Sequence, residues 1–411
     1  DTCAKLVANL GFELTSAQQR VLLEISGDLS QNTPMLRLLQ GDVGSGKTVI
    51  AAVAAVHAYE NGLQTALMAP TEILAEQHLA TFRGWLAPLG IETAWLSGKS
   101  KGAAREEELQ KIKRGDAQII IGTHALFQKD VVFQKLGLVI IDEQHRFGVN
   151  QRLALRQKGI FKNINPHQLI MTATPIPRTL TMTLYADMDV SVIDELPPGR
   201  TEVRTTVLAD PRRAEVIERI QALCAEGAQA YWVCTLIEES EVLESKAAAE
   251  TLKELTDTLP NLSISLIHGR MKPAEKAKIM CRFKEGEIDL LVATTVIEVG
   301  VDVPNASLMV IENSERLGLA QLHQLRGRVG RGQTASHCVL LYKSPLGELS
   351  RRRLEVMRNS NDGFFIAEED LRIRGPGELL GSKQSGAIQF KIADLARDSD
   401  LLPRVKAKSE Q

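Results

Sequence analysis

The sequence predicts an α/β protein with parallel sheets, and two features support this fold class. Short apolar runs alternate with helix-like stretches, beginning with "MLRLLQ" (35–40) and the Ala-rich segment that ends at Gly62. Strands that are apolar along their whole length are typical of parallel sheets covered by helices on both faces. The alternation stops at "ELPPGRTEV" (195–203), which reads as a linker, and then starts again. This restart indicates two α/β domains of similar size.

The expected strands can be placed in chain order. In the first half, the runs after 35–40 are "TALMAP", "TAWLSG", "QIIIGT", "LGLVIID" and "HQLIMTAT". In the second half they are "RTTVLA", "QAYWVC", "LSISLIHG", "DLLVATT", "SLMVIE" and "HCVLLY". After residue 345 the strand pattern ends, and "LGELSRRRLEVMRNSNDG" and "FFIAEEDLRIRG" predict helices followed by a Gly-rich loop. The expected domains are therefore 1–195 and 196–345, with a C-terminal extension over 346–411.

Composition excludes several classes of protein. With a net charge of −2 over 411 residues, nothing draws the whole chain to nucleic acid or to an anionic membrane. A polyanionic partner must therefore be held by local grooves and backbone amides. No apolar run reaches the roughly 18 residues of a membrane span. The five cysteines are scattered and form no CxxC pair, so we expect small core residues of a reducing compartment. The chain begins with Asp1 rather than Met, and we expect it to be part of a longer protein.

A phosphate-binding loop is predicted at "GDVGSGKT" (41–48), which matches GxxxxGK[ST] between an expected strand and an expected helix. Glycines let backbone N–H groups turn toward phosphate oxygens, the lysine adds a positive charge, and the threonine offers an oxygen to Mg²⁺. We expect ATP to bind here. The expected ATP-binding residues of this loop are Gly41, Asp42, Val43, Gly44, Ser45, Gly46, Lys47 and Thr48.

Two adjacent carboxylates follow the apolar run "LVIID", in "LVIIDEQHRFG" (138–148). Asp142 is expected to hold Mg²⁺ together with Thr48, and Glu143 to polarise the attacking water. An apolar run followed by Asp-Glu is common in proteins, and solvated charges at a strand end are the alternative. The phosphate-loop sequence upstream favours the catalytic interpretation.

An arginine cluster lies far along the chain, in "QLHQLRGRVGRG" (321–332), which contains Arg326, Arg328 and Arg331. Gln324, Arg328 and Arg331 belong to the pattern QxxGRxGR, and guanidinium groups suit the phosphoryl oxygens of a transition state. If the second domain faces the first, these arginines can act on a γ-phosphate that the first domain holds. A nucleic-acid backbone patch or solvated arginines remain the alternatives.

Together these motifs resemble the DExH helicases of superfamily 2, and most closely the RecG family of bacterial ATP-dependent helicases of branched DNA. The resemblance covers essentially the whole chain and rests on "MAPTEILAEQH", "IDEQHRFGV", "MTATPIPRTL", "HGRMKPAEK", "LLVATTVIEVGVDVPNAS" and "DLRIRGPGELLGSKQSG" besides the motifs above. It implies two tandem RecA-like P-loop domains, with a C-terminal helical hairpin and loop. The transcription-repair coupling translocase looks similar over much of this range, whereas "DEQHRFGV", "ELPPGRT" and "FKIADLARD" look like RecG.

The resemblance implies roles for further residues. Gln18 in "FELTSAQQ" matches the adenine contact, and Gly300 and Asp302 match the segment that meets the nucleotide from the second domain. Gln144 and His145 complete the DExH box, where His145 would sense the domain interface. Six residues match positions that contact the DNA backbone or couple it to hydrolysis: Thr71, Thr123, His124, Thr172, Thr174 and Thr294. For the hydroxyls among them, local helix capping is the alternative.

The C-terminal extension resembles a translocation motif in which a helical hairpin and loop turn cleft closure into movement along duplex DNA. Arg372, Arg374 and Gln384 match its candidate residues. The alternative is that these side chains only pack the extension onto the second domain. RecG proteins also carry an N-terminal wedge domain with an OB-fold, and no segment of this sequence resembles it. We therefore expect a motor portion, and the resemblance does not extend to junction selectivity.

The resemblance implies a cytoplasmic bacterial protein that uses ATP and Mg²⁺ on branched or duplex DNA. A monomeric state, no membrane partner and a single-stranded DNA-binding protein as a further partner belong to the same expectation. Alternatives are the coupling translocase or a replication-restart helicase, and, in another class, a nucleotide-switched DNA-binding module without turnover. Glu143, Arg328 and Arg331 argue against the binding module, because binding alone needs none of them. A membrane transporter ATPase is disfavoured by the QxxGRxGR motif.

Overall fold

The computed structural model describes residues 1–98, 101–143, 165–177, 188–197, 202–235, 241–294, 303–332 and 334–374. The chain divides into two compact units. The first comprises Asp1–Ala173 with Tyr185–Pro198, and the second comprises Thr174–Leu184 with Gly199–Gln411.

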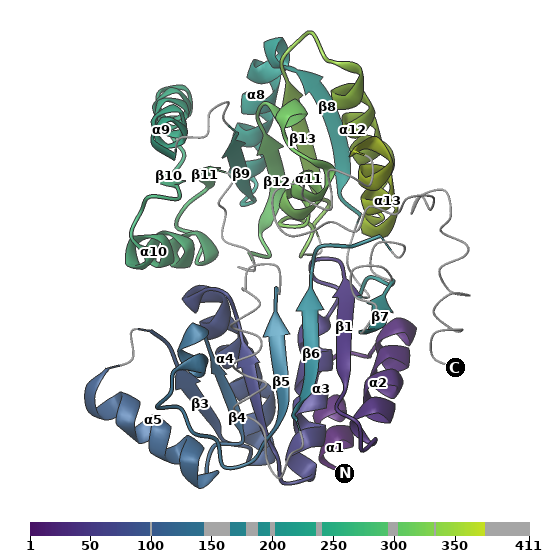
Figure 1. Cartoon of the computed structure of the whole chain (residues 1–411). Helices are drawn as coiled ribbons and strands as arrows, with labels where there is room; N and C mark the ends of the chain where they lie inside the picture. Colours follow the sequence, from purple (N-terminus) through teal and green to yellow (C-terminus); the bar gives the residue numbers. More distant parts are fainter. Residues whose placement is uncertain are drawn as a thin grey trace. The chain divides into compact units, whose positions relative to one another are not determined.

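The first unit is a seven-stranded parallel sheet flanked by helices, as the strands and helices of Figure 1 show. Its strands lie in the order β3-β4-β2-β5-β6-β1-β7. The strands are β1 (Leu36–Gly41), β2 (Gln64–Met68), β3 (Thr93–Leu96), β4 (Ile119–Gly122), β5 (Leu136–Asp142), β6 (His167–Thr172) and β7 (Asp189–Ile193). The helices are α1 (Thr2–Ala8), α2 (Ser16–Leu29), α3 (Lys47–Glu60), α4 (Glu72–Leu86) and α5 (Gly102–Arg114), with short 3-10 turns η1 (Ala87–Leu89) and η2 (His124–Phe127).

Both faces of this sheet are buried, which explains why its strands are apolar throughout. In β5, Leu138 and Ile140 belong to the core beneath α1, α2 and α3, whereas Val139 and Ile141 belong to the core on the opposite face. Successive side chains of a strand point to opposite faces, so a strand buried on both sides needs an apolar residue at every position. The predicted strands of the first unit are confirmed on this basis.

Strand β7 was not predicted from the sequence. It pairs in parallel with β1 at one edge of the sheet, where Leu38 lies opposite Val190. Its sequence "DVSVI" alternates polar and apolar residues and lies close to the linker-like prolines, so it lacks the continuous apolar run of a central strand. The polar Ser191 is buried, where its hydroxyl accepts a hydrogen bond from Arg37 of β1 at 2.9 Å.

The second unit repeats the architecture with a six-stranded parallel sheet in the order β10-β11-β9-β12-β13-β8. Its strands are β8 (Arg204–Ala209), β9 (Gln229–Cys234), β10 (Ile264–Ile267), β11 (Leu290–Thr294), β12 (Ala306–Ile311) and β13 (His337–Tyr342). Its helices are α8 (Arg213–Ala225), α9 (Glu241–Thr258), α10 (Pro273–Lys284), α11 (Leu319–Arg326), α12 (Glu348–Asn359) and α13 (Gly363–Arg374), with short turns η4 (Asp210–Arg212) and η5 (Ser314–Arg316). The strands predicted for this half are confirmed.

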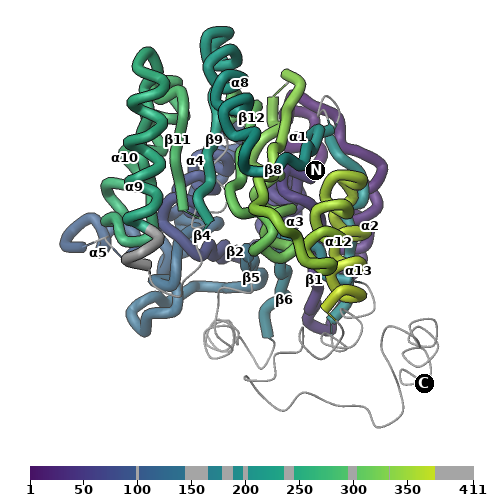
Figure 2. The backbone as a smooth tube through the Cα atoms, turned by 90° about the horizontal axis from the view of Figure 1, so that it is seen from above, coloured from purple at the N-terminus to yellow at the C-terminus, as the bar shows by residue number. Residues whose placement is uncertain are grey.

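Helices α12 and α13 form the hairpin predicted for the start of the C-terminal extension, and Figure 2 shows them side by side. Leu354 and Met357 of α12 and Ile366 of α13 join the core that contains α11. The hairpin is thus built onto the same core as the helix that opens the arginine motif.

A buried glutamine occupies the same structural position in each unit. Gln64 opens β2, and its Nε2 donates to the carbonyl oxygens of Ile112 and Ala117 at 2.9 and 2.8 Å. Gln229 opens β9, and its Nε2 donates to the carbonyls of Phe283 and Ile288 at 2.6 and 2.7 Å. In each case one amide ties the start of a strand to the last turn of a helix and to the chain that follows that helix.

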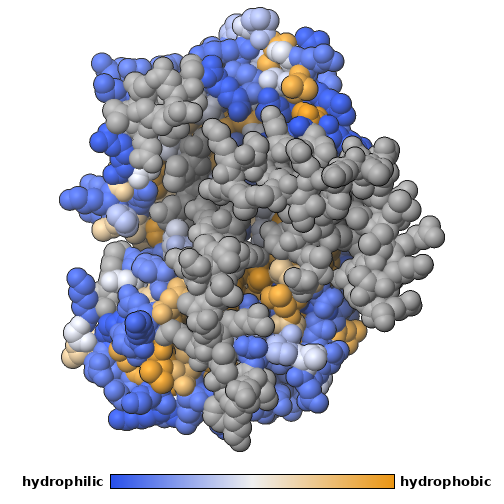
Figure 3. Space-filling view, in the orientation of Figure 1, coloured by the Kyte–Doolittle hydropathy of each residue, from blue (hydrophilic) through white to orange (hydrophobic). Residues whose placement is uncertain are grey.

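All five cysteines are free thiols, and three of them lie in the core as expected. Burial raises the pKa of Cys338 to about 12, which keeps its thiol protonated and unreactive. The expectation was wrong for Cys281, which is exposed on α10. No helix in the described ranges is long and apolar enough to cross a membrane. On the face shown in Figure 3, the described side chains are mainly hydrophilic.

Candidate active site

The phosphate loop joins β1 to α3 and has the backbone shape that its glycines allow. Gly44 and Gly46 have φ values of 79° and 88°, in the left-handed region where residues with a Cβ are strained. Lys47 Nζ donates hydrogen bonds to the carbonyl oxygens of Gly41 and Asp42, at 2.7 and 2.8 Å. The ammonium group is therefore held inside the turn, at the start of α3, where the helix dipole adds positive potential.

Gln18 packs directly against this loop. Its Nε2 donates to the carbonyl oxygen of Ser45 at 2.9 Å, and its Oε1 accepts from the N–H of Thr15 at 3.0 Å. Thr15 in turn caps α2 by accepting from the N–H of Gln18, so the two residues form a capping box. A Cβ atom at Gly46 would collide with Gln18 Nε2. The structure thus places Gln18 as a clamp on the loop, a role that the sequence analysis did not assign.

The paired carboxylates lie at the carboxyl end of β5, two strand positions from β1, which leads into the phosphate loop, because β6 lies between β5 and β1. At about 4.8 Å per strand, the ends of β1 and β5 are about 10 Å apart, which leaves room for phosphate groups. Glu143 is buried, and its Oε1 accepts from the N–H of Ala173 at 3.2 Å. Its φ of 52° is strained for a residue other than glycine, and such strain is common at functional sites.

His78 was missed by the sequence analysis. Its Nε2 lies 2.7 Å from Oδ2 of Asp142, and both residues are buried. His78 lies on α4, seven residues after Thr71, and both were in the quoted motif "MAPTEILAEQH". The available signal was a histidine at helical spacing from Leu74 and Phe82, but the sequence did not show its partner.

The other candidate residues of the first unit differ in their surroundings. Thr71 caps α4, where its hydroxyl accepts from the N–H of Leu74 at 3.4 Å. Thr123 precedes η2 and is buried, and its hydroxyl has no hydrogen-bond partner among the described residues. His124 is exposed, and Thr172 is buried at the end of β6. Local capping thus accounts for the hydroxyl of Thr71 but not for that of Thr123.

In the second unit, Gln324 of α11 donates a hydrogen bond from Nε2 to the hydroxyl of Thr174. The structure thereby brings together two of the predicted residues. Thr294 ends β11 and is buried, and its hydroxyl lacks a hydrogen-bond partner within the described part of the chain.

The three arginines of the cluster have different environments. Arg326 is buried, and its Nη1 donates to the carbonyl oxygens of Met357 and Ser360 at 2.9 and 2.7 Å. It therefore fastens α11 to the end of α12, and its guanidinium serves the fold. Arg328 is also buried, whereas Arg331 is half-buried and donates from Nε to the carbonyl of Gly327 at 3.3 Å.

The two predicted arginines of α13 pair with acidic residues of the same helix. Arg372 donates to Glu369 at 2.6 Å, and Arg374 donates to Asp370 at 3.0 Å. A Cβ atom at Gly318, the residue before α11, would collide with the guanidinium of Arg374. Arg374 therefore lies against the start of the helix that carries Gln324.

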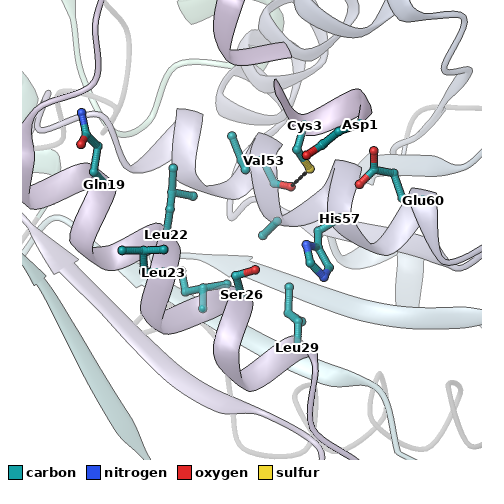
Figure 4. A pocket seen from close by; sticks show the side chains of 12 residues that line it. Asp1, Cys3, Gln19, Leu22, Leu23, Ser26, Leu29, Val53, His57 and Glu60 are labelled. Atoms are coloured by element: carbon teal, nitrogen blue, oxygen red, sulfur yellow. Dashed lines mark hydrogen bonds between the residues drawn. The ribbon is translucent and has the colours of Figure 1, made fainter. Parts of the chain in front are cut away.

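Five candidate residues lie outside the described ranges: Gln144, His145, Gly300, Asp302 and Gln384. Figure 4 shows a pocket between α2 and α3, with a volume of about 460 Å³, lined by residues such as Leu22, Ser26 and His57. None of the candidate site residues lines it. Its α3 residues begin at Val53, six positions or about 9 Å along the helix from Lys47.

Comparison with known proteins identifies the family. Family models match three segments: "DEAD/DEAH box helicase" over residues 15–183, "Helicase conserved C-terminal domain" over 214–333, and "ATP-dependent DNA helicase RecG, domain 3, C-terminal" over 360–411. The ATP-dependent DNA helicase RecG of Escherichia coli K12 is 64% identical over 403 residues, or 98% of this chain. This chain belongs to the RecG family. RecG of Haemophilus influenzae is similarly close, with 63% identity over 99% of the chain.

A solved structure of RecG bound to a three-way DNA junction matches with a TM-score of 0.82 and 45% identity over 98% of this chain. The DNA-bound helicase MrfA matches with a TM-score of 0.67 and 17% identity, a similarity that shows the fold alone. Both units thus have the RecA-like helicase fold. The chain spans 58% of the length of the Escherichia coli RecG and 52% of the chain in the junction structure.

Proposed function

We propose that the chain is the motor portion of an ATP-dependent helicase that translocates on duplex DNA and acts on branched DNA. One observation supports the proposal most directly. In a chain of the RecG family, the phosphate loop follows the carboxyl end of β1, and two buried carboxylates lie at the carboxyl end of the parallel strand β5. The RecG structure on a three-way junction supports DNA as the substrate. Repair and recombination of stalled or branched DNA follow as the biological setting.

Within this proposal, the phosphate loop neutralises charge and the carboxylates direct water. Lys47 and the first N–H groups of α3 would hold the phosphate oxygens of ATP. Glu143 would accept a proton from the attacking water, and the Ala173 N–H that bonds its Oε1 fixes the direction of its carboxylate. The strained backbone of Glu143 would orient its side chain toward this water.

The donor set of the site suits Mg²⁺. Thr48 offers a hydroxyl oxygen and Asp142 a carboxylate oxygen, which are ligands that this cation prefers. When bound, Mg²⁺ would neutralise charge on the phosphate oxygens. Thr48 and Asp142 are the residues that would hold it.

The arginine motif is proposed to act on the γ-phosphate from the second unit. Arg328 and Arg331 would stabilise the charge of the transition state, while Gln324 would couple this step to the Thr174 segment through its hydrogen bond. Gly300 and Asp302 would meet the nucleotide from the same unit, and Gln144 and His145 would complete the box after Glu143.

DNA is proposed to contact the turns that follow the strands and to be moved by the C-terminal extension. The candidate DNA contacts are Thr71, Thr123, His124, Thr172, Thr174 and Thr294. Small hydroxyls and N–H groups at such turns bind phosphate without reading bases. Arg372, Arg374 and Gln384 would transmit closure to the duplex. A single-stranded DNA-binding protein as partner, a monomeric state and a cytoplasmic location rest on the family resemblance.

Triplex displacement tests the proposal. A third strand bound to duplex DNA is released when a translocase passes, without any need to unwind a branch. We expect ATP-dependent release by the chain, and loss of release in Lys47→Ala because the loop then lacks its positive charge. Release that is equal with and without ATP, or unaffected by Lys47→Ala, would refute the motor assignment.

A further inference from the structure

The pair formed by His78 and Asp142 is set apart by its burial and its geometry. The side chains are only 7% and 11% exposed, and Nε2 lies 2.7 Å from Oδ2. Among the described residues, this is the one hydrogen bond that the structure gives to the Asp142 carboxylate, and it occupies a single oxygen. Because the carboxylate accepts, Nε2 is assigned the proton.

His78 reaches Asp142 from a position that is otherwise apolar. The buried residues of α4 are Leu74, Ala75, His78, Phe82 and Leu86, which form one stripe at helical spacing. Helix α4 follows β2, which pairs with β5, and His78 reaches Asp142 at the carboxyl end of β5. An apolar side chain would fill this position without the desolvation that an imidazole requires.

A buried pair of this kind is a poor source of stability. Replacing a buried polar pair with well-packed apolar residues is often neutral or stabilising, so packing alone does not explain an imidazole at this position. A carboxylate that binds a cation, by contrast, needs a fixed orientation, and the terminal torsion of an aspartate is intrinsically broad. Hydrogen bonds from neighbouring side chains commonly supply that orientation to metal ligands.

We infer that His78 is a positioning residue: it holds Asp142 Oδ2 so that the carboxylate faces the divalent cation that accompanies the nucleotide. The inference rests on the proposed function, because it requires a nucleotide and its cation at the phosphate loop. It assigns no contact between His78 and substrate. The role is to keep Asp142 in one orientation.

The test measures binding rather than turnover. Binding of a fluorescent ADP analogue to the whole chain is recorded in EDTA and over a series of Mg²⁺ concentrations. His78→Leu removes the hydrogen-bond donor. His78→Asn keeps an amide N–H but places it closer to the main chain than Nε2 of the histidine. His78→Gln places an amide N–H near the position of Nε2. His57→Gln, on α3 and outside this contact, is the matched control, and thermal unfolding checks the fold of each variant.

We expect His78→Leu and His78→Asn to raise the half-saturating Mg²⁺ concentration by about 10- to 100-fold, with parental affinity in EDTA. His78→Gln should restore most of the parental Mg²⁺ requirement. If His78→Leu does not fold, the Asn and Gln variants decide. Parental Mg²⁺ requirements in His78→Asn and His78→Leu, or equal losses of affinity with and without Mg²⁺, would overturn the inference. A parent chain that binds no nucleotide would refute the proposed function itself, which is a distinguishable result.

Discussion

Gln18 donates a hydrogen bond from Nε2 to the carbonyl oxygen of Ser45, 2.9 Å away, and so joins α2 to the phosphate loop. The same helix start is tied to the end of the first unit, because the N–H of Ala17 donates to Glu195 at 3.0 Å. Glu195 lies immediately before the linker-like prolines. The start of α2 thus contacts both the phosphate loop and the segment that leads to the second unit.

Gln18→Ala distinguishes a clamp on the loop from a contact with adenine. Removing the clamp loosens the loop for every nucleotide, so we expect the affinities for ATP and GTP to fall by a similar factor. Loss of one hydrogen bond of about 1 kcal/mol corresponds to about fivefold. Fluorescence titrations with both nucleotides measure this change. A loss confined to ATP would show that Gln18 reads the base, as its resemblance to the motif implies.

Gln64→Leu should destabilise the first unit strongly. The side chain makes four hydrogen bonds to backbone groups, including those that its Oε1 accepts from the N–H groups of Gln134 and Lys135 at 2.8 and 3.1 Å. Leaving such groups buried without partners should lower the free energy of unfolding by about 3 kcal/mol or more. Denaturant unfolding measures it, with Gln110→Leu on α5 as the control, because the hydrogen bond that the Gln110 side chain donates to Glu106 is exposed to solvent. Equal stability in the two variants would show that the neighbouring backbone re-pairs without the amide.

A feature could be predicted when residues adjacent in the sequence determine it, and was missed when it depends on residues far apart in the chain. The central strands, the phosphate loop and the Asp142–Glu143 pair were predictable because each depends on adjacent residues. The contact between His78 and Asp142 joins residues 64 positions apart, and it depends on the folded position of α4, from which His78 reaches the end of β5. Gln64 and Gln229 were missed for the same reason, because their partners are backbone groups of distant segments. Strand β7 was missed because an edge strand next to a turn carries little apolar signal.

The stability of the first unit should depend on pH through His167. Burial lowers the pKa of His167 below its ordinary 6.5, against a smaller opposing effect of Asp28. Its Nδ1 accepts a hydrogen bond from the N–H of Met35 at 2.9 Å, which requires that nitrogen to be unprotonated. The folded state therefore binds fewer protons than the unfolded state below pH 6.5. The contribution of neutral His167 to the stability of the folded state is complete above about pH 6.5, and it is lost as the pH falls through the lowered pKa of His167.

Melting temperatures at pH 7.5 and pH 5.5 test this dependence. His167→Asn keeps an acceptor for the Met35 N–H but does not titrate, so its melting temperature should fall less on acidification than that of the parent. Some dependence should persist, because burial also lowers the pKa of His337 in the second unit. An Asn variant as acid-sensitive as the parent would exclude His167 as the cause.

Gly318→Ala offers a way to displace Arg374 without changing its charge. The added methyl group would occupy the position of the Arg374 guanidinium at the start of α11, and the flexible side chain would have to move away. If Arg374 transmits movement, Gly318→Ala and Arg374→Ala should both retain DNA-stimulated ATPase activity and lose triplex displacement. Gly347→Ala before α12 is the matched control, because its added methyl group would meet open space.

The packing alternative gives a different pattern in the same assays. If Arg374 only fastens the hairpin, both variants should lower the melting temperature and reduce ATPase activity and displacement together. Arg372→Ala and Gln384→Ala extend the comparison to the other candidates of the extension. If a variant changes neither ATPase activity nor triplex displacement, the substituted residue has no role in the mechanism.

The central claim is that a chain with this site hydrolyses ATP in response to DNA, and steady-state turnover tests it most directly. ATP hydrolysis is measured with and without a three-way DNA junction, for the parent and for Glu143→Gln. We predict turnover that the junction increases in the parent. We predict a loss of about 10²-fold or more in Glu143→Gln, because the amide cannot accept a proton, with nucleotide binding retained. Turnover that DNA does not change, or a Glu143→Gln variant that hydrolyses ATP at the parental rate, would contradict the account.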